Sequence, residues 1–205
     1  MDQERFRLLM ELTTRITNHF EQSAHLQLET AELLAPVIAA AAERIVTALL
    51  DERKVLACGN GGAAALAQYF AACMLNRFDL ERPGLATIAL PADNSVLTAI
   101  ANDSQFDQVF SRQILTLGHP GDVLLALSFN GNSPNVLKAV DAAHEREMTV
   151  IALTGGDGGR LMELLSERDI HLGIPHEQRA RVQEVYILVL HCLCDAIDCL
   201  LLGVE

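Results

Sequence analysis

The chain has 205 residues, of which 50% are hydrophobic and 20% charged, so it can bury a sizeable core and wholesale disorder is excluded. Trp is absent and aromatic residues make up only 4%, so this core must be aliphatic. The formal net charge of −12 repels the phosphate backbone of nucleic acids, so we expect no direct binding of DNA or RNA.

The first 50 residues are predicted to form two helices. Residues 4–31 carry apolar side chains at helical spacing, and no strand pattern interrupts them. We expect Pro36 to end this helix and a second helix to span residues 37–50. The apolar stripe of the first helix must be covered, either by the sheet of its own domain or by a bundle with other subunits. We favour the bundle and interpret residues 1–35 as an oligomerisation helix within a single domain of residues 1–205.

The rest of the chain alternates between short apolar runs and helical patterns. The predicted strands are 54–58, 86–90, 123–127, 149–153 and 170–174. The predicted helices are 63–78, 95–101, 106–117, 134–146, 159–165 and 180–202. Continuous apolar strands that alternate with helices indicate a parallel sheet covered on both faces. The expected fold is therefore α/β, a doubly wound parallel five-stranded sheet with an N-terminal helical extension.

Two strand-to-helix junctions have loops suited to an anion. Residues 58–63 are rich in glycine, and residues 128–133 include the hydroxyl groups of Ser128 and Ser133. Glycine allows the backbone to approach a ligand, and the free N–H groups of a helix N-terminus favour negative charge. The alternative is a pair of capped turns, since Ser133 before Pro134 is a good N-cap. A third glycine-rich loop at residues 153–159 is either part of this site or a plain turn.

The C-terminal helix combines polar and thiol side chains. Gln183 and His191 lie two turns apart on one face, although spacing alone favours His191 as a core histidine. Three of the five cysteines lie in this segment, and no CxxC pair occurs, which favours reduced thiols and a cytoplasmic location. The most apolar stretch, residues 185–194, is too short to span a bilayer, and no signal peptide is seen, so we expect no membrane association.

In combination, these segments resemble the SIS-domain family of phosphoheptose isomerases, in order and over nearly the whole chain. The matching motifs are residues 58–62, 101–103, 121–126, 131–133, 153–159 and 181–184. The resemblance implies a SIS fold, a homotetramer with bundled N-terminal helices and sites between subunits, and a phosphorylated sugar as ligand. The residues that it implies for phosphosugar binding are Asn60, Gly61, Gly62, Asn102, Asp103, Ser128, Asn130, Ser133 and Gln183.

The chain departs from the family at the residues that carry the chemistry. Family isomerases have a His and a Glu one turn apart on the helix after the first loop, which bind zinc with a Gln and a His of the terminal helix. Here these positions hold Tyr69 and Cys73, whereas Gln183 and His191 match. The phosphate loops also differ, because Ala63 and the bulkier Phe129 replace hydroxyl residues of the family. We therefore expect weakened phosphosugar binding and no zinc or other cofactor.

Two main interpretations follow. We expect a non-catalytic scaffold of the branch that binds the replication initiator DnaA, in which Leu201 and Leu202 contact the partner. The alternative is an active isomerase that converts sedoheptulose 7-phosphate to D-glycero-D-manno-heptose 7-phosphate. His191 would then be catalytic, and zinc would have Cys73, Gln183 and His191 as candidate ligands. A phosphosugar sensor with another partner is a third interpretation that the sequence leaves open.

Overall fold

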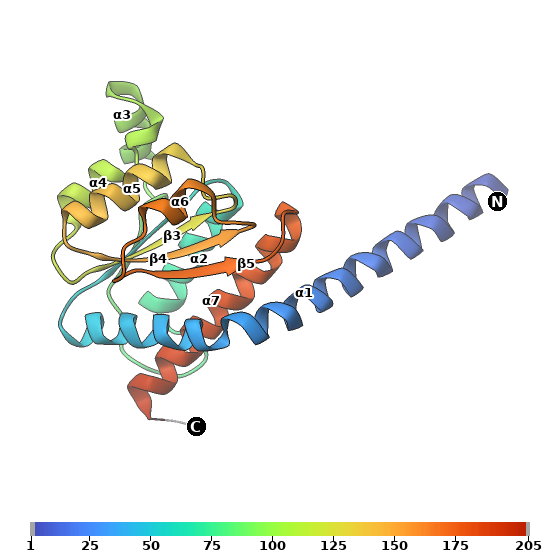
Figure 1. Ribbon diagram of the computed structural model, residues 1–205, viewed down its shortest axis with the longest axis horizontal. Helices are drawn as coiled ribbons and strands as arrows, with labels where there is room; N and C mark the ends of the chain where they lie inside the picture. The colour runs from blue at the N-terminus through green and yellow to red at the C-terminus, as the bar shows by residue number, and fades with distance from the viewer. Residues whose placement is uncertain (1–2, 204–205) are drawn as a thin grey trace.

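A five-stranded parallel sheet lies between two layers of helices in the computed structural model, which describes residues 3–203 (Figure 1). The helices are α1 (Gln3–Leu50), α2 (Gly62–Leu75), α3 (Asn94–Asp103), α4 (Ser111–Leu117), α5 (Pro134–Glu145), α6 (Gly159–Leu164) and α7 (Arg179–Leu202), with a 3-10 turn at Phe106–Gln108. The strands are β1 (Val55–Gly59), β2 (Thr87–Ala89), β3 (Val123–Ser128), β4 (Thr149–Gly155) and β5 (Ile170–Ile174). The predicted α/β fold and its five strands are confirmed.

The alternation of side chains along each strand builds two separate cores. In β1, Val55 and Ala57 face the layer of α1, α2 and α7, whereas Leu56 and Cys58 face the layer of α4 and α5. The strand order is β2-β1-β3-β4-β5, so the chain reverses its direction of winding between β1 and β3. In open parallel sheets, ligands bind at the carboxyl ends of the strands that flank such a reversal.

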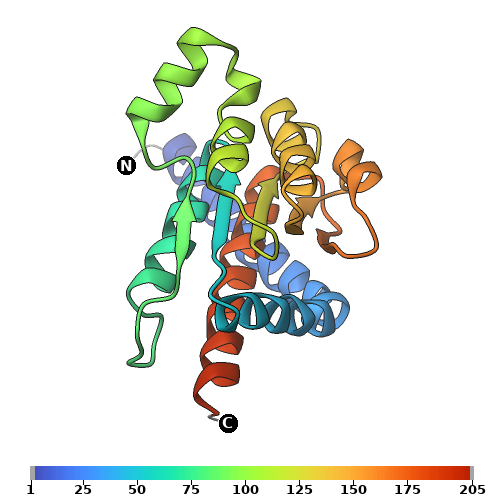
Figure 2. The same cartoon turned by 90° about the vertical axis from the view of Figure 1, so that its left-hand side faces the viewer.

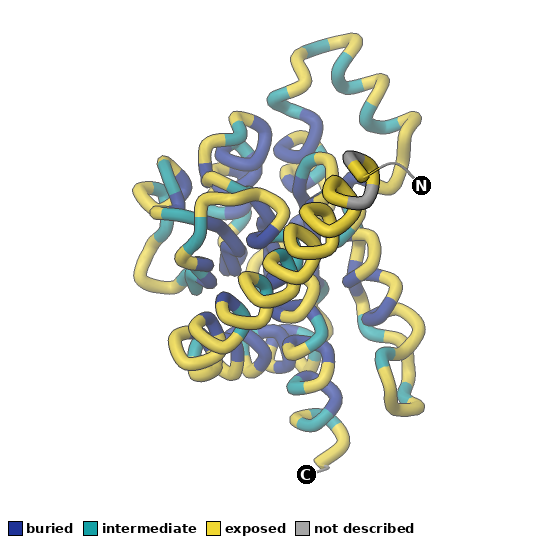
Figure 3. Tube along the Cα trace, turned by 90° about the vertical axis from the view of Figure 1, so that its right-hand side faces the viewer, coloured by how far each residue is buried: buried dark blue, intermediate teal, exposed yellow. Residues whose placement is uncertain are grey.

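Helix α1 is continuous from Gln3 to Leu50, so the prediction that Pro36 ends it was wrong. Proline removes one intrahelical hydrogen bond, but here Leu34 and Ile38 on either side are buried in the main core. This tertiary packing holds the helix together across the proline. The N-terminal part of α1 projects away from the sheet (Figure 1), and its surface is exposed along that length (Figure 3).

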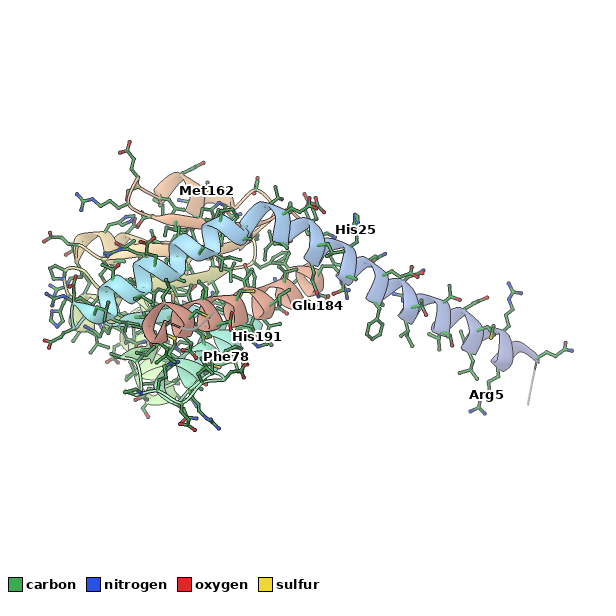
Figure 4. The ribbon with its side chains drawn as sticks, turned by 90° about the horizontal axis from the view of Figure 1, so that it is seen from below. Arg5, His25, Phe78, Met162, Glu184 and His191 are labelled. Atoms are coloured by element: carbon green, nitrogen blue, oxygen red, sulfur yellow. The ribbon has the colours of Figure 1, made fainter. Side chains whose placement is uncertain are left out.

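The two longest helices belong to the core of the domain. Both α1 and α7 are long and apolar enough to cross a membrane by length and composition, a test that core helices of soluble proteins also pass. In this chain they pack against each other and against one face of the sheet. Arg181 of α7 also joins them, because its guanidinium donates to the carbonyl oxygen of His19 at 2.6 Å and pairs with Glu184 at 2.7 Å. Figure 4 shows Glu184 beside α1.

A second buried arginine joins α2 to α7. The Nε of Arg82 pairs with Asp198, and both side chains are almost completely buried. The same guanidinium donates to the carbonyl oxygens of Met74 and Cys73 at the end of α2, at 2.9 and 3.1 Å, and the Met74 oxygen also accepts from the Leu85 N–H. One side chain therefore caps α2 and fixes it against α7.

We predict that Asp198→Ala lowers the free energy of unfolding by about 3–5 kcal/mol, because it leaves the buried Arg82 charge without its partner. Urea denaturation followed by circular dichroism measures this change. The matched control is Glu81→Ala, which breaks the exposed Arg77–Glu81 pair and should change stability by about 0.5 kcal/mol or less. Equal effects of the two substitutions would contradict the anchoring role.

Candidate functional site

A hollow of about 160 Å³ lies at the carboxyl ends of β1 and β3, where the winding of the chain reverses. It is lined by residues 60–63 after β1, by residues 127–130 and Ser133 around the end of β3, and by Arg179, Gln183 and Tyr186 of α7. Most of the residues that the resemblance implied therefore lie together. These are Asn60, Gly61, Gly62, Ser128, Asn130, Ser133 and Gln183.

Two helix N-termini face this hollow without a side-chain cap. Neither Gly61 before α2 nor Ser133 before α5 caps its helix through a side chain, and the backbone N–H groups of Gly62 and Asn135 have no partner among the described residues. Gly61 has a φ of 56°, which favours glycine. A Cβ at Gly62 would collide with the Gln183 amide, so this glycine lets α7 approach the loop.

The two loops are joined by a pair of amide side chains. Asn60 and Asn135 donate to each other in two hydrogen bonds of 2.8 Å, and Asn135 is buried. The Asn60 side chain is thus engaged in fixing the two loops against each other. Asn135 is not among the residues predicted from the sequence, where its only signal is a polar residue in the first turn of an apolar helix.

The third glycine-rich loop supports the second loop and does not line the hollow. Gly131 has a φ of 65°, and a Cβ there would overlap the carbonyl group of Gly158. Further along, Gly159 packs in the same way against Asn130 and Asn132. Of the two interpretations of residues 153–159, the structure favours a turn, one that holds residues 128–133 in place.

A hydrogen-bonded pair of side chains lies further along α2 and α7, away from the hollow. The hydroxyl group of Tyr69 on α2 is 2.9 Å from Nε2 of His191 on α7. The His191 ring also lies beside Phe78, with ring centroids 5.4 Å apart (Figure 4). Interaction with the Cys73 side chain raises the pKa of Tyr69 above its usual value, and burial adds to the shift. Tyr69 is therefore a neutral phenol near pH 7 and can donate its proton to the imidazole.

The helix rise sets the distance between this pair and the hollow. Tyr69 is seven residues beyond Gly62, which corresponds to about 10 Å along α2 at about 1.5 Å per residue. This distance is comparable with the length of an extended sugar phosphate. The pair and the hollow are therefore about two turns apart along α2.

The residues present do not fit the zinc ion of the family. Among the side chains that the structure describes, no three His, Cys, Asp or Glu residues converge as a metal-binding group. Nε2 of His191 faces the Tyr69 hydroxyl, and Cys73 is buried beside Tyr69 and Cys194. The Gln183 amide lies against Gly62, at the hollow. Our expectation of no cofactor stays a prediction, which metal analysis of the purified protein tests.

Besides Cys73 and His191, four more of the residues selected from the sequence lie away from the hollow. Asn102 and Asp103 end α3, which stands off the sheet (Figure 2), and the Asn102 amide donates to Asp103 at 3.0 Å. Their role in sugar binding stays a prediction. Leu201 and Leu202 lie in the last turn of α7, where Leu201 packs on the main core and Leu202 is 41% exposed.

Comparisons with known proteins agree with this geometry. The SIS domain model matches residues 18–155, and the chain belongs to the SIS-domain family. Its relatives include the phosphoheptose isomerase of Aromatoleum aromaticum, 61% identical over 96% of this chain and 99% of that protein. The phosphoheptose isomerase of Azoarcus sp. is 59% identical over 96% of this chain and 100% of that protein. The solved phosphoheptose isomerase GmhA of Neisseria gonorrhoeae has a TM-score of 0.87 and 48% identity, and covers 91% of this chain and 98% of its own. The chain is thus a homologue of the phosphoheptose isomerases within the SIS family.

These relatives contradict the interpretation of the chain as a non-catalytic DnaA-binding scaffold. That interpretation took Tyr69 and Cys73 as evidence that the chemistry had been lost. The structure adds that Tyr69 contacts His191, a pairing that the sequence analysis did not consider.

We predict that Tyr69 determines which ring nitrogen of His191 carries the proton. A hydroxyl that donates to Nε2 holds the proton of neutral imidazole on Nδ1, so Tyr69→Phe should shift the tautomer toward Nε2–H. Long-range ¹H–¹⁵N correlation spectra of the imidazole measure this change. The control is Tyr186→Phe, which removes the only other phenol of the chain, a donor to the Leu153 carbonyl group. Unchanged His191 signals in Tyr69→Phe would contradict the assignment.

Proposed function

We propose that the chain is a sugar-phosphate isomerase that converts sedoheptulose 7-phosphate to D-glycero-D-manno-heptose 7-phosphate. The single observation that carries the proposal is the 2.9 Å contact between Tyr69 and His191, positioned one sugar length from an anion-binding hollow. The names of relatives that match almost the full length of the chain support this substrate.

The phosphate group is bound at the hollow in this proposal. The hydroxyl groups of Ser128 and Ser133 lie 3.5 Å apart, with Ser128 donating to Ser133, and each can rotate to donate to a phosphate oxygen. The uncapped N-termini of α2 and α5 supply backbone N–H groups and the positive ends of two helix dipoles. Gln183, from α7, offers its amide to the sugar hydroxyl groups.

The reaction moves one hydrogen between neighbouring carbons. His191 accepts the proton from C1 of the ketose while Tyr69 donates its O–H proton to the carbonyl oxygen on C2, which gives an enediol. The Tyr69 phenolate then accepts the proton of the C1 hydroxyl group, and His191 returns its proton to C2. Atoms and charges balance, and both side chains end in their starting states. The raised pKa of Tyr69 keeps the phenol protonated at the start of the cycle.

The test is turnover of sedoheptulose 7-phosphate, followed by NMR with and without added zinc. We expect heptose phosphate from the wild type in both conditions and a loss of about 10²- to 10⁴-fold in kcat for His191→Ala, because general acid–base groups contribute about that much. His119→Ala, at an exposed histidine outside the hollow, should be as active as the wild type. Absence of product from folded protein in both conditions would overturn the proposal.

We also propose that the chain is a homotetramer, held together by the projecting part of α1. The support is an apolar stripe that no other part of this chain covers between residues 3 and 203. Leu9, Leu12, Ile16 and Phe20 follow helical spacing and are 44–74% exposed. The five free thiols support a reducing, cytoplasmic setting for this assembly.

We predict that Ile16→Glu dissociates the tetramer, because it places a charge in the centre of this stripe. Light scattering coupled to size-exclusion chromatography measures the mass. The control is Thr14→Glu, which places the same charge on the opposite side of α1 and should leave the assembly unchanged. A wild-type monomer, or equal masses for both variants, would contradict the prediction.

A further inference from the structure

We propose that Arg179 is the charged ligand of the phosphate group and that Phe129 is the residue that holds it in position. The inference rests on the phosphate hollow of the proposed function and adds its specificity-determining pair. The guanidinium carbon of Arg179 lies 5.2 Å from the centre of the Phe129 ring, and both residues line the hollow. They come from different elements, the start of α7 and the loop after β3.

The charge balance of the hollow singles out Arg179. Among the described residues that line it, Arg179 is the only one with a charged side chain; the others are apolar, hydroxyl or amide residues and glycines. The nearby Arg181 is buried and turned away, since its guanidinium bonds His19 and Glu184. A phosphate monoester carries a charge of about −1.5 to −2 near pH 7. Without Arg179, this charge would face only neutral donors and the ends of two helices.

The position of Phe129 leaves the donors of Arg179 free. A cation–π contact with the Phe129 ring attracts the guanidinium charge without an oxygen acceptor. Within residues 3–203, no carboxylate or carbonyl oxygen accepts a hydrogen bond from the Arg179 side chain. These donors are thus free to bind phosphate oxygens in the bidentate geometry that arginine favours.

The geometry of α7 directs Arg179 toward the same ligand as Gln183. The two residues are four apart, so they share one face of the helix, and Gln183 reaches the first loop at Gly62. Phe129 was expected to narrow the hollow and weaken binding. In the structure, Phe129 supports the positive charge of Arg179 at the hollow. This charge compensates for the hydroxyl group that is absent at Ala63.

The experiment measures the binding of inorganic phosphate by isothermal titration calorimetry, which needs no turnover. We expect Arg179→Ala to raise the Kd by about 10- to 100-fold, because it removes charge-assisted hydrogen bonds. Phe129→Leu should raise the Kd by a smaller factor, and combining it with Arg179→Ala should add almost nothing, since Phe129 acts through Arg179. Arg168→Ala removes an exposed arginine outside the hollow and is the matched control. Circular dichroism verifies that each variant is folded.

The outcomes separate this inference from the proposed function. A Kd for Arg179→Ala within about twofold of the control overturns the inference, as does a wild type that binds no phosphate. Arg179-dependent phosphate binding by a protein that never turns over sedoheptulose 7-phosphate supports the inference and rejects only the isomerase. Turnover with a KM that Arg179→Ala leaves unchanged supports the isomerase and rejects the inference.

Discussion

The buried ion pair between Arg82 and Asp198 fixes the relative position of α2 and α7, and the candidate site depends on that position. Helix α2 provides Tyr69 and the loop at its N-terminus, whereas α7 provides Gln183 and His191. A hydrogen bond of 2.9 Å between Tyr69 and His191 tolerates little sliding of one helix past the other. Arg82 restricts that sliding because it also bonds the carbonyl oxygens at the end of α2.

The two proposed functions of the site, anion binding and proton transfer, lie at different positions along α2 and α7. In the proposed function, phosphate binds at the N-termini, where backbone N–H groups and helix dipoles are found, and proton transfer takes place about two turns further along. The departures from the family pattern occur at both ends. At the proton-transfer end Tyr69 contacts His191, and at the anion end Phe129 supports Arg179. In this proposal, each change substitutes one interaction for another.

The fold could be predicted from the sequence to a large extent because buried parallel strands are continuous apolar runs with glycine or polar residues at their ends. Local rules failed at Pro36, where packing on the core outweighs a lost hydrogen bond. The loops of the site were also found from the sequence, since glycine after a strand is a local signal. The contact between Tyr69 and His191 could not be found in this way, because 122 positions separate the two residues and only the tertiary fold brings them together. Without it, the loss of the family Glu suggested a scaffold that the relatives contradict.

The central claim is that Tyr69 and His191 form a working acid–base pair, and the kinetics of Tyr69→Phe on sedoheptulose 7-phosphate test it most directly. The substitution removes one oxygen and preserves the ring, so binding at the distant phosphate loops should not change. The account predicts that kcat falls by about 10²- to 10⁴-fold with little change in KM, as expected for an interaction made only in the transition state. A Tyr69→Phe protein with wild-type kcat would contradict the account, because the proton of the phenol would then have no part in the reaction.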